Sequence, residues 1–70
     1  MSNIPSLNSK ELIKILLQRG FIFDRSKGSH QIFIHKDLKR RVVVPMHNKD
    51  LPRGTFYAIL KQAGIDKNDL

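Results

Sequence analysis

Three histidines, His30, His35 and His47, are the residues of this chain best suited to moving protons. Histidine titrates near neutral pH, so it can take a proton from one group and give a proton to another. RNA carries its own nucleophile, the ribose 2′-hydroxyl. Its cleavage needs a base for that hydroxyl, an acid for the leaving oxygen and positive charge at the phosphate. Histidine together with lysine or arginine can supply all of these without a metal ion.

The acidic residues do not favour metal chemistry. Each is expected to be isolated at a helix cap, a turn or the tail, and none forms a cluster of the kind that binds magnesium: Glu11, Asp24, Asp37, Asp50, Asp66 and Asp69. A two-metal nuclease is therefore not expected. The chain has no cysteine, no glycine-rich phosphate loop and no nucleophile elbow. We expect neither a metal nor a cofactor.

The charge balance favours a polyanionic partner. Lys and Arg total 13 against 6 for Asp and Glu, which gives a formal net charge of +7. Such a chain suits nucleic acid, an acidic protein or an anionic membrane. No apolar run approaches the roughly 20 residues of a membrane span, and residues 1–7 lack the pattern of a secretory signal. We therefore expect a cytoplasmic protein without a membrane role.

The first expected element is an amphipathic helix. Asn8 and Glu11 have the spacing of a capping box, and the apolar residues that follow fall on one face: Leu12, Ile13, Leu16 and Leu17. Gly20 is placed to end this helix in the left-handed conformation. A second helix is expected after Asp50 as its cap, with Pro52 in its first turn and Gly64 at its end. Its apolar stripe consists of Phe56, Ile59, Leu60 and Ala63.

Between the helices, β-branched and aromatic residues predict three strands, at residues 21–23, 29–35 and 41–46. The order is thus α-β-β-β-α, which predicts an α+β fold with a three-stranded antiparallel sheet and both helices on one face. The chain is expected to form a single domain at 1–70, with an N-terminal arm at 1–7 and a C-terminal tail at 65–70.

The hairpin between the second and third strands sets which residues share a face. A four-residue loop at 37–40 would pair His30 with His47, with their Cβ atoms about 4.5–5.5 Å apart. A three-residue loop would separate the two histidines. The four-residue loop divides the sheet into two faces. We expect the first to pack under the helices: Phe33, Val42, Val44 and Met46. The second stays open: His30, His47, Ile32, Ile34, Val43 and Pro45.

An open apolar surface beside histidines marks a binding site. The expected phosphate ligands are Lys27, Lys49 and Arg53, and Arg53 lies at the start of the second helix, where free backbone amides favour an anion. His35 is expected to be a structural or surface residue.

Several of these segments together resemble the HicA toxins. The sequence Lys27-Gly28-Ser29-His30 entering a strand is similar to the signature of that family. Val42-Val43-Val44-Pro45-Met46-His47 is similar to its third strand, and matching segments occur in both helices. One departure is the second turn, where Asp37-Leu38 stands in place of a common Asp-Gly. Leucine disfavours positive φ, so a tight two-residue turn is not expected there.

The resemblance implies a fold similar to the double-stranded RNA-binding domain, and an mRNA interferase that inhibits translation and is paired with a HicB antitoxin. His30 corresponds to the catalytic histidine of the family, Gly28 and Ser29 to its motif turn, and His47 to a motif residue that could be a second catalytic group. The alternative is a non-catalytic RNA-binding module of the same fold. His30 in its Gly28-Ser29 context separates the two hypotheses, because a pure binder has no need of a histidine there. A HicB-like antitoxin is expected to cover the open face, unless the tail at 65–70 covers it instead.

Overall fold

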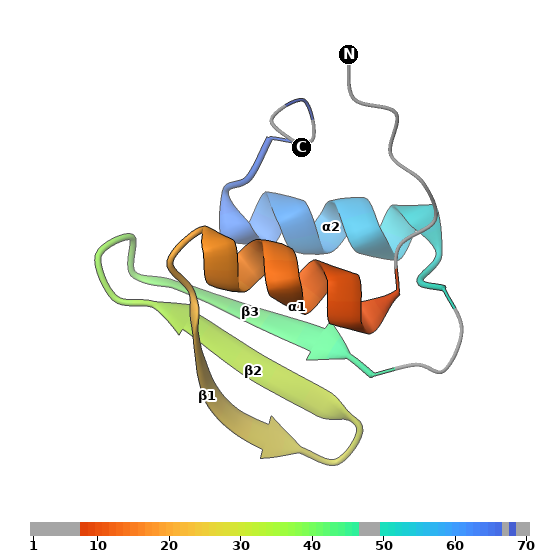
Figure 1. The fold of residues 1–70 in the computed structure, drawn as a ribbon, viewed down its shortest axis with the longest axis horizontal. Coiled ribbons are helices and arrows are strands. Elements are labelled where there is room, and N and C mark those ends of the chain that lie inside the picture. Colours follow the sequence, from red (N-terminus) through yellow and green to blue (C-terminus); the bar gives the residue numbers. More distant parts are fainter. Residues whose placement is uncertain (1–7, 47–49, 67, 69–70) are drawn as a thin grey trace.

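The computed structural model describes residues 8–46, 50–66 and 68, and it has the predicted order of elements (Figure 1). The elements are α1 (Ser9–Gln18), β1 (Ile22–Lys27), β2 (His30–His35), β3 (Arg40–Pro45) and α2 (Arg53–Ala63). The three strands form one antiparallel sheet in the order β1-β2-β3. The predicted α+β fold is confirmed.

Helix α1 begins and ends as its sequence predicts. The side chain of Asn8 accepts a hydrogen bond from the backbone N–H of Glu11 at 2.9 Å, which satisfies one of the free amides of the first turn. At the other end Gly20 adopts a φ of 93°. The backbone N–H groups of Gly20 and Phe21 then bond to the carbonyls of Leu17 and Leu16. These two hydrogen bonds form a Schellman motif, which turns the chain directly into β1.

Helix α2 starts differently from the prediction. Its N-cap is Pro52, which has an extended ψ of 144° and contributes no side-chain hydrogen bond. The expectation that Asp50 caps this helix was wrong, because Asp50 lies two residues before the N-cap. The end is as predicted: Gly64 has a φ of 73°, and the N–H groups of Gly64 and Ile65 bond to Lys61 and Leu60.

The strands differ in length and register from the predictions. β1 extends to Lys27 rather than ending at residue 23, and the loop between β2 and β3 occupies 36–39, one residue earlier than expected. Two features fix this loop: Lys39 adopts a positive φ of 55°, and the N–H of Leu38 bonds to Nδ1 of His35. Consequently His30 pairs with Pro45, Phe33 with Val42, and His35 with Arg40.

The face assignment is confirmed for the described residues, because the register moves by an even number of residues and each side chain stays on its predicted face. Phe33, Val42 and Val44 are buried in one core together with residues of both helices, and Met46 packs against it. The helix residues in this core are Leu12, Leu16, Phe56, Ile59, Leu60 and Ala63. Ile65 of the expected tail belongs to the same core, so at this residue the tail packs on the helix side and does not cover the open face.

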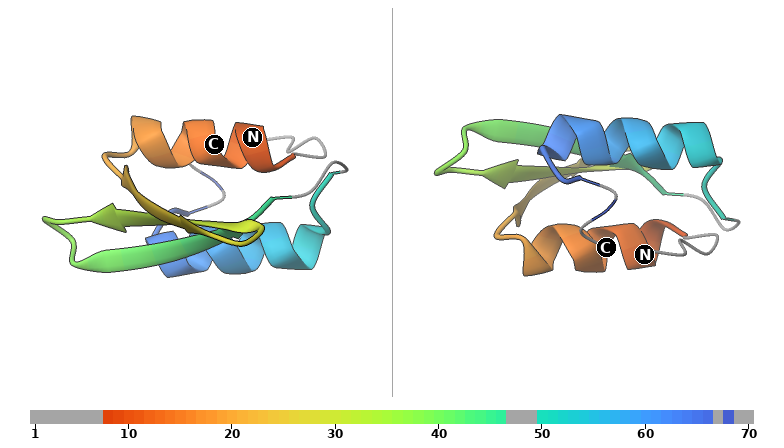
Figure 2. Two further views of the ribbon diagram at one scale, coloured as in Figure 1. Left: turned by 90° about the horizontal axis from the view of Figure 1, so that it is seen from below. Right: turned by 90° about the horizontal axis from the view of Figure 1, so that it is seen from above.

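The two helices run in the same direction alongside each other (Figure 2). Their N-terminal ends therefore lie at the same end of the molecule as the β1–β2 turn and the end of β3 (Figure 1). Their C-terminal ends lie with the β2–β3 loop at the opposite end. We call the first the histidine-turn end, defined by Gly28, Ser29 and His30, and the second the locked end, defined by Gly20, His35 and Arg40.

Candidate nucleic-acid interface

The Gly28-Ser29 turn is a two-residue hairpin loop between the paired residues Lys27 and His30. Gly28 has a φ of 60°, whereas Ser29 is not among the residues with positive φ. Glycine at the first loop position with positive φ is the pattern of a type II′ turn, whose twist matches that of the flanking strands. The carbonyl of Ser29 accepts the N–H of Met46 at 2.7 Å. The turn is thereby tied to the end of β3 as well as to β1.

His30 is exposed and begins β2 directly after this turn. It lies between Lys27 on β1 and Pro45 on β3. Because Met46 and Ser29 are hydrogen-bonded and bonded pairs alternate in an antiparallel ladder, His30 and Pro45 form a non-bonded pair, with Cα atoms about 4.5 Å apart. The predicted pairing of His30 with His47 was therefore wrong for this register. His47 itself lies outside the described residues.

Pro45 is well suited to this position on an edge strand. It has no N–H, and in a non-bonded pair no N–H is required towards β2. Its carbonyl accepts the hydroxyl of Ser9 at 2.7 Å, and Ser9 is 1% exposed. The first residue of α1 therefore holds the strand that flanks His30, so the histidine sits on backbone fixed from three sides: β1, β3 and α1.

The sheet surface opposite the helices, which we call the open face, carries three cations besides His30. Its members come from all three strands: Ile22, Arg25 and Lys27; His30, Ile32 and Ile34; Arg41, Val43 and Pro45. Ile32 is 3% exposed but is not part of the helix-side core. It lies on the central strand between its partners Arg25 on β1 and Val43 on β3, so residues of both neighbouring strands flank it. The open face is thus an apolar centre bordered by cations.

Arg25 and Arg41 were not among the predicted phosphate ligands. The prediction ended the first strand at residue 23, so Arg25 was read as loop. Arg41 was expected to begin the third strand, and no role was assigned to its charge. The signal that could have found Arg25 is the two-residue turn at Gly28-Ser29, which pairs Lys27 with His30 and therefore Arg25 with Ile32.

The predicted phosphate ligands lie in different places. Lys27 is exposed and directly opposite His30. Arg53 is the exposed first residue of α2, a helix that has no acidic residue in its first turn and no side-chain cap. Its free amides and partial positive charge favour an anion. Lys49 lies outside the described residues.

His35 has a structural role, which is one of the two alternatives that the sequence left open. Its ring packs edge-on against Phe21, with centroids 5.1 Å apart, and its Nδ1 accepts the N–H of Leu38. Nearby, Nη1 of Arg40 donates to the carbonyl of Gln62 at 3.1 Å, so this arginine satisfies a carbonyl at the end of α2. Both residues therefore hold the locked end together.

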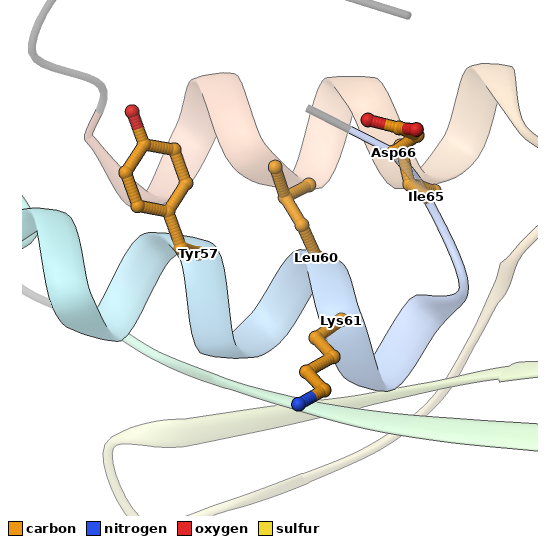
Figure 3. Close-up of a pocket in the computed structure, with 5 residues that line it drawn as sticks. All are labelled: Tyr57, Leu60, Lys61, Ile65 and Asp66. Atoms are coloured by element: carbon orange, nitrogen blue, oxygen red, sulfur yellow. The ribbon is translucent and has the colours of Figure 1, made fainter. Parts of the chain in front are cut away.

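Two hollows are lined by described residues, and neither of them includes His30. One of about 240 Å³ is lined by Tyr57, Leu60, Lys61, Ile65 and Asp66; within it Lys61 points away from the other four side chains (Figure 3). Another of about 220 Å³ lies beside His35 at the locked end. In the described part of the chain, no group of three or more His, Cys, Asp or Glu residues gathers as a metal site would require. Neither described helix has the length and apolar composition that crossing a membrane requires.

Comparison with known families gives one match. The model of the HicA toxin of bacterial toxin–antitoxin systems matches residues 9–65, which is most of the 70-residue chain. No curated protein matches the chain. The matched range includes both helices, the whole sheet and the Gly28-Ser29-His30 turn. The chain therefore belongs to the HicA toxin family.

Proposed function

We propose that this HicA-family toxin is an endoribonuclease that cuts mRNA without a metal ion and so inhibits translation, with His30 as its proton-transfer group. The observation that carries the proposal is the position of His30: it is exposed on the open face, lies opposite Lys27, follows a turn bonded to Met46, and pairs with Pro45, which α1 holds through Ser9. A catalytic side chain needs such a rigid support, because small errors in its position are costly.

The chemistry follows from these residues. His30 accepts the proton of a ribose 2′-hydroxyl, or protonates the leaving 5′-oxygen, while the 2′-oxygen attacks the adjacent phosphorus. Lys27, directly across the ladder, stabilises the negative charge that builds up on the phosphate. Arg53 and Lys49 are further phosphate ligands, and His47 is the candidate for the second proton-transfer group. Gly28 and Ser29 form the turn that presents His30.

The experiment is a cleavage assay with purified protein and RNA in the presence of EDTA. The wild-type protein should cut RNA, and His30→Ala should bind RNA without cutting it. If His47 shares the proton transfers, His47→Ala should lower the rate about 10²–10⁴-fold, and the wild-type rate should pass through a maximum with pH. Cleavage that EDTA abolishes and His30→Ala retains would contradict the proposal. Binding by the wild-type protein without any cleavage would favour the alternative, a non-catalytic RNA-binding module.

The cognate antitoxin is the second expected partner. We infer that it is HicB-like and covers the open face, because an apolar centre bordered by cations suits an acidic protein surface on a chain of charge +7. Covering this face would bury His30 and block RNA at the same time. A structure of the complex tests this inference. An antitoxin bound on the helix side, with His30 exposed, would contradict it.

A further inference from the structure

β1 contains one residue more than a regular pairing with β2 allows. Phe23 pairs with Phe33, but the next pair is Arg25 with Ile32, so Asp24 is the extra residue of a β-bulge. The two ends of β1 are held in different registers by separate contacts, and the bulge lies between them. The Gly28-Ser29 turn sets the register of Lys27, while the ring of Phe23 packs against that of Phe33 with centroids 5.8 Å apart.

The bulge changes which side chains share a face. In a regular strand, residues 23, 25 and 27 would all point to one side, because side chains alternate with a period of two. Here Phe23 lies on the helix side with Phe33, whereas Arg25 and Lys27 lie on the open face with Ile32 and His30. Arg25 and Lys27 keep the face that the Gly28-Ser29 turn gives them, and the bulge moves Phe23 off the surface that carries His30.

These two cations form a row along β1. Arg25 and Lys27 are two residues apart, so their Cα atoms are separated by about 6.6–6.8 Å along the strand. Lys27 faces His30, and Arg25 faces the next residue of β2 on the same side, Ile32. A polyanion that places one phosphate at Lys27 and His30 can therefore place a neighbouring phosphate at Arg25.

The side chain of Arg25 is available for such a contact. It is 70% exposed, and its Nε donates to the carboxylate of Asp24 at 3.0 Å. This contact uses only the inner nitrogen. In the described part of the structure the two terminal nitrogens have no partner, and these are the atoms that bind phosphate in a two-pronged geometry.

We propose that Arg25 is a substrate-binding residue for the backbone of an RNA strand running along β1 past His30, and that the bulge at Asp24 serves to keep Phe23 off this path. The proposal rests on the proposed function, since it takes RNA as the ligand. It adds a binding residue and a direction for the substrate: along β1, away from the Gly28-Ser29 turn.

The test uses the His30→Ala protein, so that binding is measured without cleavage. The probe is a fluorescent single-stranded oligoribonucleotide, and its affinity is measured by anisotropy over a range of salt concentrations. Arg25→Gln should weaken binding to oligonucleotides of different sequence. It should also reduce the slope of log affinity against log salt by about 0.7–1, because one phosphate contact is lost. Arg25→Lys should restore the slope, because it restores the charge.

The matched control is Lys14→Gln, which removes the same charge from an exposed position on α1. It should leave the salt slope unchanged. Asp24→Asn should raise the affinity, because it removes the carboxylate that competes for Arg25. If Arg25→Gln and Lys14→Gln change the slope equally, the proposal is overturned and the attraction is that of net charge alone. If the His30→Ala protein and the wild-type protein both fail to bind RNA, the proposed function itself fails.

Discussion

Strand β2 begins and ends with a histidine, and the two differ in almost every physical respect. His30, at the histidine-turn end, is exposed and lies opposite a lysine and a proline. His35, at the locked end, is half-buried, packs against Phe21 and bonds to the following turn. The residue type is the same and the strand is the same. The surroundings alone leave one ring accessible and make the other hold the fold together.

The two ends also differ in how their backbone is fixed. At the locked end, side chains hydrogen-bond to the backbone and pack closely against it. His35 accepts the N–H of Leu38 in the turn and lies close to Gly20. Arg40 donates to a carbonyl at the end of α2 and lies close to Gly64. At the histidine-turn end, the hydrogen bonds that hold the turn and β3 are accepted by backbone carbonyls, those of Ser29 and Pro45. This arrangement leaves the side chains of the turn free for a ligand. On the proposed function, the contacts that stabilise the fold and the group that performs the chemistry lie at opposite ends of one small domain.

The largest expected difference between the ends concerns two glycines with positive φ. A Cβ at Gly20 would lie 2.8 Å from Nε2 of His35, whereas a Cβ at Gly28 would meet nothing within 4 Å. Gly20→Ala should therefore cost about 2–4 kcal/mol of unfolding free energy, from backbone strain and the displaced histidine, and Gly28→Ala about 1–2 kcal/mol from strain alone. Urea unfolding of both variants measures this. Equal losses would show that His35 does not crowd Gly20.

A smaller difference is expected between two exposed arginines. Arg40→Gln removes the hydrogen bond to the carbonyl of Gln62 and should lower the unfolding free energy by about 0.5–1.5 kcal/mol. Arg53→Gln should change it by less than about 0.5 kcal/mol. In the RNA-binding assay the order should reverse, with Arg53→Gln reducing the salt slope more than Arg40→Gln does. If Arg40→Gln lost more RNA binding than Arg53→Gln, the assignment of RNA binding to the histidine-turn end would be contradicted.

The smallest effect is expected at the β2–β3 loop. Lys39 adopts a φ of 55°, a conformation that glycine takes without strain. Lys39→Gly should therefore stabilise the protein by up to about 1 kcal/mol, offset in part by the greater freedom of glycine in the unfolded chain. RNA cleavage should not change, because the loop lies at the locked end. Thermal unfolding and the cleavage assay measure the two quantities side by side.

Much of this fold was predictable because local signals and apolar periodicity agree. The cap at Asn8, the glycines at 20 and 64, and the stripe from Phe56 to Ala63 each predicted the observed feature. The division of the sheet into a helix side and an open side was also predictable, since it depends only on alternation. What failed was the position of the β2–β3 loop, because it depends on a lysine with positive φ and on the contact between His35 and Leu38.

The candidate site was predictable in part. The Gly28-Ser29-His30 turn and its position on the open face follow from the motif and from alternation. The pairing with His47 did not hold, because a shift of the loop by one residue moves the pairing by two. Arg25 was missed because the first strand was ended too early, although a two-residue Gly28-Ser29 turn pairs it with Ile32. The side of Phe23 could not be placed from the sequence, because the bulge at Asp24 arises from two separately fixed registers and carries no local signal of its own. Misplacing the loop left the predicted fold and faces unchanged, but it gave the wrong partner for His30.

The central claim is that His30 serves chemistry and His35 serves the fold, and one paired measurement tests it most directly. RNA cleavage and the free energy of unfolding are measured for His30→Ala and His35→Ala, at a temperature where both variants are folded. His30→Ala should lose cleavage by at least about 10²-fold and keep its stability within about 0.5 kcal/mol. His35→Ala should lose about 1–3 kcal/mol of stability, from the ring contact and the turn bond, and still cut RNA. Cleavage retained by His30→Ala, or lost by folded His35→Ala, would contradict the account.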